Sequence, residues 1–270
     1  MRDGADHIKV AIWQGSPKRG NVMQNLERLA AIAAEAAERD ADVLIFPEGY
    51  LTASQGMPNA RAIARSINDD MDAELARIAR SNGVALMVGA HEEEAGSLYS
   101  TAFFYCPHWG CIGTYRKRTL MEEWEKAILT RGQQSLALDY RGWKFGMLIG
   151  SDMDFPELVR EVAHEGIDAL LIAASRSDEQ QGVTDMMLPV RAVENQIYLL
   201  YANRAGQQSG TTFSGASRIV GPDGKLLGQL PDEATDMLIT TLSKSEIGRS
   251  RAEFCYLEEA RALRAPVDMG

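Results

Sequence analysis

The chain has 270 residues, of which 45% are hydrophobic and 24% charged, and its formal net charge is −10. This composition predicts a folded protein with a sizeable core, and the negative charge disfavours association with nucleic acid or with an anionic membrane surface. No apolar segment approaches the roughly 18 residues of a membrane span, and three cysteines suit a reducing compartment better than a disulfide framework. We therefore expect a soluble, cytoplasmic protein.

The first half of the chain alternates strand-like and helix-like segments without a linker. Apolar runs predict strands at 8–13 and 42–46, and leucines and alanines at helical spacing predict a helix over 23–38 between them. A helix at 71–82 follows. The next predicted strands are 84–90, 99–106 and 111–116, the last two as antiparallel neighbours.

The second half repeats this order of elements. The predicted elements are a strand at 143–150, a helix from about Pro156, a strand at 168–174, a helix over 184–195, and strands at 197–203, 215–221 and 237–242. Strands mixed with helices in this way are typical of an α/β protein with layered sheets and outer helices. We expect a single domain over residues 1–270, in which 245–270 form a polar, partly helical C-terminal tail.

Three positions share one place in this pattern. Glu48, Lys117 and Gly150 each stand at or just after the end of a predicted buried strand. Ligands of open α/β sheets bind outside the carboxyl ends of the strands. Each position alone equally fits a solvated loop residue, so the prediction of a site rests on their combination.

Five segments carry a resemblance to a known family. They are PEGYLT at 47–52, YRKRTL at 115–120, SDMDFPE at 151–157, RAVENQIYLLYAN at 191–203 and SRIVGPDGKLLG at 217–228. In this order and spacing they resemble the nitrilase or carbon–nitrogen hydrolase superfamily over nearly the whole chain. The chain looks most similar to short bacterial amidases that act on linear ω-amino amides, such as 5-aminopentanamidase, or on N-carbamoyl amines.

The resemblance implies a four-layer α-β-β-α sandwich, a homodimer or higher homo-oligomer, and an amidase with a Glu-Lys-Cys triad acting on a small-molecule amide. Glu48 matches the general base, and Lys117 matches the lysine that stabilises the tetrahedral intermediate. Glu123 matches a second glutamate that the family holds close to the lysine and the substrate, and the main-chain N–H of Ser151 matches an oxyanion donor. No metal or organic cofactor is implied.

The nucleophilic cysteine of the family falls on Gly150, which has no atom that could attack a carbonyl. Three explanations stay open: an amidase inactivated by substitution of its cysteine, a natural non-catalytic binding or interaction protein on the same scaffold, or a displaced nucleophile at Ser151. The third is disfavoured because neighbouring positions at a strand end point in different directions. Thr119, where the family often has histidine, and the segment 173–176, which lacks the family's proline, leave the specificity open.

Other polar groups favour structural interpretations. The segment CPHWGC at 106–111 holds two thiols and an imidazole, but a closed zinc site needs four ligands, so we predict a turn between two strands. Arg191 and Glu194 lie at helical spacing and predict an ion pair that holds their helix to the sheet. Glu157 follows Pro156 in a first helical turn, where a carboxylate is favoured by the helix dipole.

Overall fold

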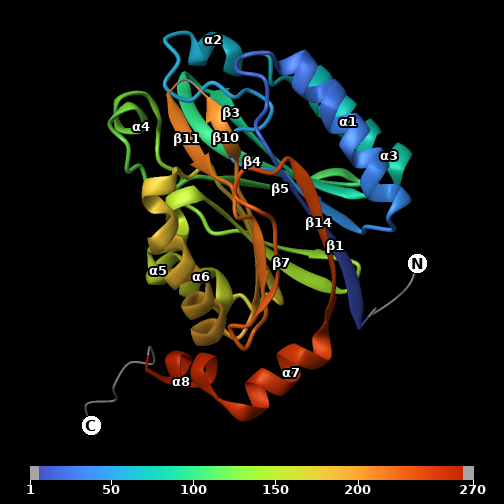
Figure 1. Cartoon of the computed structure of the whole chain (residues 1–270), viewed down its shortest axis with the longest axis vertical. Helices are drawn as coiled ribbons and strands as arrows, with labels where there is room; N and C mark the ends of the chain where they lie inside the picture. Colours follow the sequence, from blue (N-terminus) through green and yellow to red (C-terminus); the bar gives the residue numbers. More distant parts are fainter. Residues whose placement is uncertain (1–5, 209, 264–270) are drawn as a thin grey trace.

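Two six-stranded mixed sheets face each other in the computed structural model, which describes residues 6–208 and 210–263 (Figure 1). The first sheet has the spatial order β14 (Asp236–Ser243), β1 (His7–Gln14), β2 (Val43–Ile45), β3 (Ala85–Glu94), β4 (Ser97–Cys106) and β5 (Gly110–Arg116). The second has the order β13 (Leu226–Gln229), β12 (Arg218–Val220), β9 (Tyr198–Ala202), β8 (Ala169–Ala173), β7 (Trp143–Ile149) and β6 (Ala137–Tyr140).

The two sheets share one pairing pattern. In the first, β1, β2 and β3 are parallel, and β14, β4 and β5 add antiparallel strands around them. In the second, β7, β8 and β9 are the parallel core, and β6, β12 and β13 are antiparallel. The carboxyl ends of the parallel strands of the two sheets lie next to each other. This is seen in the hydrogen bond from the main-chain N–H of Glu48, after β2, to the carbonyl of Ala174, after β8 (3.1 Å).

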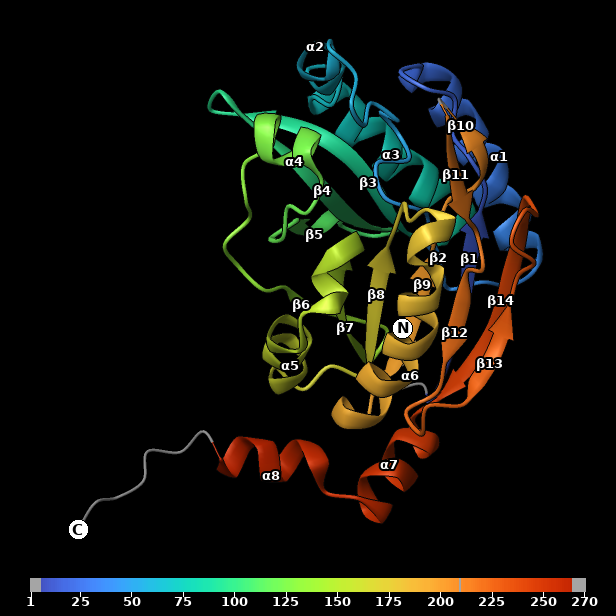
Figure 2. The ribbon, with the colours of Figure 1, turned by 60° about the vertical axis from the view of Figure 1, so that its left-hand side comes forward.

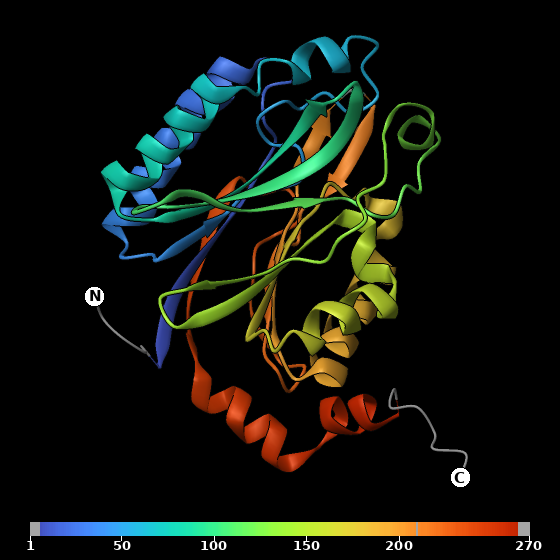
Figure 3. The same cartoon turned by 180° about the vertical axis from the view of Figure 1, so that it is seen from behind.

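Helices cover the outer face of each sheet, which gives four layers (Figure 3). Over the first sheet lie α1 (Val22–Glu38) and α3 (Asp69–Asn82), and over the second lie α5 (Pro156–His164) and α6 (Gln181–Asn195). The smaller elements are α2 (Ala60–Ala64), α4 (Glu123–Ile128), α7 (Lys244–Glu253), α8 (Tyr256–Ala262), the 3₁₀ turns η1 (Gly150–Asp154) and η2 (Asp178–Gln180), and the hairpin β10 (Ala205–Gln208) and β11 (Thr211–Ser214). None of the helices in the described part of the chain is long and apolar enough to span a membrane.

The helices over the first sheet begin at asparagine caps. The side chain of Asn21 accepts from the N–H of Gln24 at the start of α1, and that of Asn68 accepts from the N–H of Met71 at the start of α3. Each bond satisfies one main-chain donor that the first helical turn leaves open. Gly83 ends α3 in the left-handed conformation that glycine adopts without strain.

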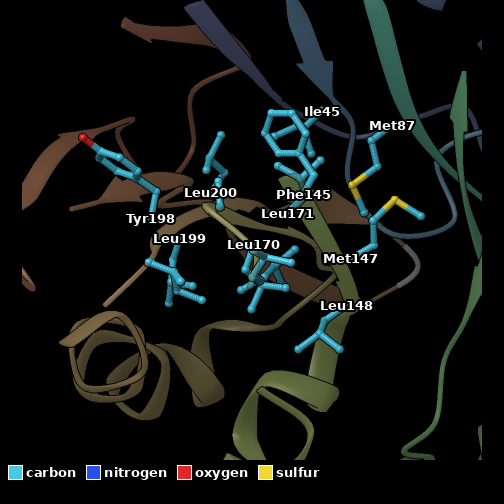
Figure 4. Packing of buried hydrophobic residues seen from close by; sticks show 14 of the residues in the cluster. Ile45, Met87, Phe145, Met147, Leu148, Leu170, Leu171, Tyr198, Leu199 and Leu200 are labelled. Atoms are coloured by element: carbon cyan, nitrogen blue, oxygen red, sulfur yellow. The ribbon is translucent and has the colours of Figure 1, made fainter. Parts of the chain in front are cut away.

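The main core lies between the two sheets (Figure 4). Ile45 and Met87 of the first sheet pack there with Phe145, Met147 and Leu171 of the second, and all five are fully buried. Burial of one such side chain contributes about 1.5–3 kcal/mol, so this shared interior holds the halves together.

Most of the predicted elements are present, and several boundaries move. The strand predicted at 42–46 is shorter (β2, Val43–Ile45), because Pro47 has no N–H to continue the ladder, whereas that at 84–90 extends to Glu94 as β3. The tail predicted from 245 forms α7 and α8, and 264–270 lie outside the described residues. The pattern missed α2, α4, β6, β13 and the β10–β11 hairpin.

Candidate active site

Glu48, Lys117 and Gly150 meet in one cavity of about 670 Å³. Glu48 follows β2, Lys117 follows β5, and Gly150 begins η1 directly after β7. The carboxyl ends of strands from both sheets therefore form the site. Figure 2 shows α4 and the β10–β11 hairpin on either side of the end of β8, and residues of both line the cavity. Other lining residues are Arg19, Gln55, Trp124, Ser175, Arg176 and Arg204.

Lys117 lies between two carboxylates at the floor of the cavity. Its Nζ is 2.9 Å from Oε1 of Glu48 and 2.5 Å from Oε1 of Glu125, and all three side chains are buried. Burial alone would lower the pKa of Lys117, but the charges of Glu48 and Glu125 and the hydrogen bonds to both raise it above its ordinary value. The ammonium is therefore charged at neutral pH and is held as a fixed cation.

The carboxylate of Glu48 is held by three side chains. Besides Lys117, the hydroxyl of Ser100 donates to Oε1 (3.2 Å) and that of Ser175 donates to Oε2 (2.9 Å). Burial opposes ionisation, but the charge of Lys117 and the hydrogen bonds from Lys117 and Ser175 keep the pKa of Glu48 below its ordinary value. Glu48 is thus a carboxylate at neutral pH and can accept a proton.

Gly150 presents its α-carbon to these two groups. It has a φ of +51°, in the left-handed region that side-chain-bearing residues rarely adopt. A β-carbon added there would lie 2.8 Å from Oε2 of Glu48 and 3.1 Å from Nζ of Lys117. A side chain at position 150 would therefore enter the space between the carboxylate and the ammonium, and Glu48 would have to shift slightly to admit it.

Asp152 ties the Lys117 loop to the turn that holds Gly150. Its carboxylate accepts from the N–H of Arg118 (3.1 Å), the N–H of Thr119 (2.7 Å) and the hydroxyl of Tyr115 (2.8 Å). It is completely buried, and burial raises its pKa although these hydrogen bonds oppose the rise. These bonds fix the position of Lys117 relative to Gly150, so Asp152 has a structural role.

The expectation that Glu123 lies close to the lysine is wrong, and Glu125 takes that place. The side chain of Glu123 is 92% exposed and pairs with Lys126 (2.8 Å), because it points outward from α4. Glu125 points inward, and its second oxygen accepts from the N–H of Met121 and Glu122 at the start of the helix. Three glutamates stand within four residues of MEEWEK, and the sequence does not decide which one faces the cavity.

Ser151 lies beside Gly150 and lines the cavity. Its hydroxyl contacts the hydroxyl of Thr119 (2.8 Å), and in the described part of the chain its hydrogen bonds run to Thr119 rather than to a carboxylate base. This arrangement disfavours Ser151 as a nucleophile, since a serine hydroxyl needs an adjacent base.

The ion pair expected between Arg191 and Glu194 is present at 2.9 Å, but both residues lie on α6, so the pair itself does not hold the helix to the sheet. Arg191 also donates to the carbonyls of Met153 (3.1 Å) and Asp154 (2.8 Å), so α6 supports the turn that begins at Gly150. The segment 106–111 forms the turn between β4 and β5, as expected.

Arg204 and Ser175 are site residues that the sequence analysis missed. Both follow the parallel strands of the second sheet, Ser175 after β8 and Arg204 after β9, and both line the cavity. The rule that led to Glu48, a polar residue after a buried strand, also applies to Arg204, which follows the predicted strand at 197–203.

Comparison with known families gives a match to carbon–nitrogen hydrolases over residues 9–252. The chain is 32% identical to a Pseudomonas protegens protein described as a hydrolase in the pqqF 5′ region, over 96% of this chain and 90% of the relative. It is 28% identical to an (R)-stereoselective amidase of a Pseudomonas species, over 95% of this chain and 92% of that enzyme.

Solved structures of the amidase from Nesterenkonia sp. AN1 are similar to the whole fold. A double mutant of that amidase in complex with acrylamide has a TM-score of 0.85 at 29% identity, over 96% of both chains. Another mutant of it, with a TM-score of 0.85, shows covalent addition of the acetamide moiety of fluoroacetamide at the active-site cysteine, over 95% of both chains. The layered α/β fold and the likeness to amidases are confirmed by these matches.

Proposed function

The chain belongs to the carbon–nitrogen hydrolase family, and from this premise we propose that its cavity binds a small linear amide or carbamoyl compound at a site that lacks only a thiol. In this proposal Glu48 is the general base, Lys117 the cation that faces the oxyanion, and Gly150 the place of the nucleophile. Glu125 takes the part of the second glutamate, and the N–H of Ser151 is the oxyanion donor.

One observation carries the proposal. A β-carbon built on Gly150 would lie 2.8 Å from the Glu48 carboxylate and 3.1 Å from the Lys117 ammonium. A side chain at position 150 would therefore lie between a base and a cation, the two groups that an attacking thiol and its oxyanion require. A mutant of the Nesterenkonia amidase shows covalent addition of the acetamide moiety of fluoroacetamide at the active-site cysteine, which supports a thiol as the missing group.

A cysteine at position 150 would complete the reaction as follows. Glu48 takes the thiol proton, the thiolate attacks the carbonyl carbon, and Lys117 and the Ser151 N–H stabilise the oxyanion. The carbon–nitrogen bond then breaks, and Glu48 returns the proton to the departing ammonia. Glu48 next activates a water molecule that hydrolyses the thioester, which releases the acid and regenerates the thiol.

The test is to compare Gly150→Cys with Gly150→Ala. Both variants place a side chain in the same left-handed backbone conformation, so both carry the same strain of about 1–2 kcal/mol, and they differ only in the thiol. We expect Gly150→Cys to release ammonia from short aliphatic amides and to form an acyl adduct visible by mass spectrometry, whereas Gly150→Ala does neither. A folded Gly150→Cys protein that stays inert over a broad amide panel contradicts the proposal.

A second candidate is a binding protein that does not turn over its ligand. It is supported by the bonding of Glu48, whose carboxylate is satisfied by Lys117, Ser100 and Ser175 without a thiol. Titration calorimetry of the present chain and of Gly150→Cys with butyramide separates the two candidates. Equal, tight binding to both without product favours the binding protein.

The assembly and the compartment are parts of the same proposal. We infer a homodimer or higher homo-oligomer from the family likeness alone, and light scattering on the purified chain tests it. A cytoplasmic location is supported by Cys106, Cys111 and Cys255, all of which are free thiols.

A further inference from the structure

Arg204 is a buried cation whose hydrogen-bonding capacity is only partly used. It follows β9, lines the cavity and is 1% exposed. Its Nη1 donates to Oε1 of Gln55 (3.1 Å), and its guanidinium lies 5.0 Å from the ring centroid of Phe213. Nε and Nη2 are buried and have no hydrogen-bond partner among the described residues.

The neighbouring carboxylates do not supply the missing acceptors. Glu48 is bonded to Lys117, Ser100 and Ser175, and Glu125 is bonded to Lys117 and to two main-chain N–H groups. The charged residues that line the cavity are the cations Arg19, Lys117, Arg176 and Arg204 and the carboxylates Glu48, Glu122, Glu125, Asp178 and Glu179. None of these carboxylates accepts a hydrogen bond from Nε or Nη2 of Arg204. Buried donors without acceptors are costly, most of all on a charged group.

A second arginine lies near this guanidinium. The exposed Arg19 lines the same cavity, and its Nη2 lies 3.5 Å from the carbonyl oxygen of Gln55, the residue whose side chain contacts Arg204. Burial lowers the pKa of Arg204 to about 10, Glu48 opposes this change, and Arg19 adds to it by repulsion. An anion bound here would supply acceptors and reduce the repulsion, whereas an ammonium group would increase it.

We propose that Arg204 binds a carboxylate of the ligand, so that the cavity takes an amide with an acid group at its other end, such as the monoamide of a dicarboxylic acid. The inference rests on the proposed function for the position of the amide, beside Lys117 and Gly150. A carboxylate fits because its two oxygens match the planar fork of the Nε and Nη2 donors. It replaces the expectation of an amine-bearing substrate.

The test is titration calorimetry of the present chain, which needs no catalysis. The ligands are glutaramate, the neutral diamide glutaramide, and the cationic 5-aminopentanamide. We expect glutaramate to bind at least about tenfold more tightly than glutaramide and 5-aminopentanamide to bind most weakly, because a pair of charge-assisted hydrogen bonds is made only by the acid. Equal affinities for glutaramate and glutaramide, or no binding of glutaramate, overturn the proposal.

Substitutions at Arg204 then test whether this residue causes the preference for glutaramate over glutaramide. Arg204→Gln should abolish it and Arg204→Lys should reduce it severalfold, since an ammonium cannot pair with both oxygens. Arg249→Gln removes the same charge from the exposed face of α7 and should leave the preference intact. If Arg204→Gln does not fold, Arg204→Lys decides, and an unchanged preference in it contradicts the proposal. An inert Gly150→Cys would end the amidase proposal without affecting these binding results, so the two failures are distinguishable.

Discussion

Lys117 is the residue on which the electrostatics of the site depend. Its ammonium is buried and touches both Glu48 (2.9 Å) and Glu125 (2.5 Å), so removal of either carboxylate leaves a buried cation with one partner fewer. Glu125 also accepts from two main-chain N–H groups at the start of α4. It therefore stabilises both the charge of the lysine and the helix beside the cavity.

Glu125→Gln should lower the free energy of unfolding by about 3 kcal/mol, because breaking a buried ion pair exposes the full desolvation cost of the remaining charge. Glu123→Gln is the matched control, since the exposed Glu123 pairs with the exposed Lys126 on the surface of α4. Urea unfolding monitored by circular dichroism measures both. Equal effects of the two substitutions would contradict the assignment of Glu125 to the lysine.

His91 is a second buried titratable group near the site. Its Nδ1 lies 2.6 Å from the hydroxyl of Ser54, and its ring packs edge-on against Trp124 at a centroid distance of 5.9 Å. Burial lowers its pKa to about 4, the charge of Glu48 opposes the shift, and the charges of Lys117 and Arg204 add to it. The imidazole is therefore neutral in the folded protein at pH 7.

This shift predicts a loss of stability in acid. Between pH 6.5 and pH 4 the unfolded chain binds a proton at His91 that the folded protein does not, so stability decreases as the pH falls through this window. The loss amounts to about 3 kcal/mol over the window, at about 1.4 kcal/mol per pH unit. Urea unfolding between pH 7 and about pH 4.5 should show a flatter dependence for His91→Gln, whereas the exposed His108→Gln should keep that of the unsubstituted chain. An unchanged slope in His91→Gln would exclude this residue as the source.

At the scale of the elements, strand ends were the predictable part of the site. The ends of predicted buried strands located Glu48, Lys117 and Gly150, because strand ends follow from hydrophobic patterning, and the resemblance assigned their roles. Glu125 lies on α4, six residues long, and its inward direction depends on how the loop docks rather than on local spacing. The position of the Arg204 guanidinium depends on its contacts with Gln55, which is distant in sequence, and with Phe213 on β11, a strand that the sequence pattern missed.

The missed elements share a physical reason. α2, α4 and β13 are short, and the residues of β13 are mostly exposed, so they show no hydrophobic period that a sequence pattern could detect. They form because larger elements provide a surface for them. The long, strongly periodic segments, α1 and α3, were predicted within two residues of their observed ends.

Gln196 joins the last two helices to the rest of the molecule. It ends α6 in the left-handed conformation (φ +54°), and its buried side chain donates to the carbonyls of Ser250 (2.8 Å) and Phe254 and accepts from the N–H of Leu257 (3.2 Å). α7 has further contacts, such as the hydroxyl of Ser250 with the carbonyl of Pro222 (3.0 Å). Two of the three Gln196 bonds thus hold α7 and its C-terminal cap, and one holds the start of α8, which Arg261 also ties to the carbonyl of His164 (3.2 Å).

Gln196→Ala should increase amide hydrogen exchange in both α7 and α8, because it removes three buried or partly buried hydrogen bonds worth about 1 kcal/mol each. Hydrogen–deuterium exchange with mass spectrometry measures the protection of each helix. Glu246→Ala, which removes a partly exposed side chain of α7, is the control and should leave α8 protected. Unchanged protection of α8 in Gln196→Ala would show that its docking depends on other contacts.

At the scale of the whole molecule, the two sheets share the main core and the site, although the first sheet has a further core against α1 and α3. The interior between the sheets combines side chains of both, among them Ile45 and Met147. The first sheet also takes its edge strand β14 from the end of the chain, paired with β1 along eight residues. The site exists only where the strand ends meet, so its geometry requires both sheets to be folded.

This sharing of one core predicts a single cooperative unfolding transition. Trp13 lies on β1 in the first sheet and Trp143 on β7 in the second, and both are buried, so each reports on one sheet. In two chains that each retain one of them, with the other tryptophans replaced by phenylalanine, urea curves from fluorescence and from far-ultraviolet circular dichroism should superimpose. A fluorescence midpoint that precedes the dichroism midpoint in either chain would show that one sheet unfolds while the other persists, and the shared core would then be too weak to couple them.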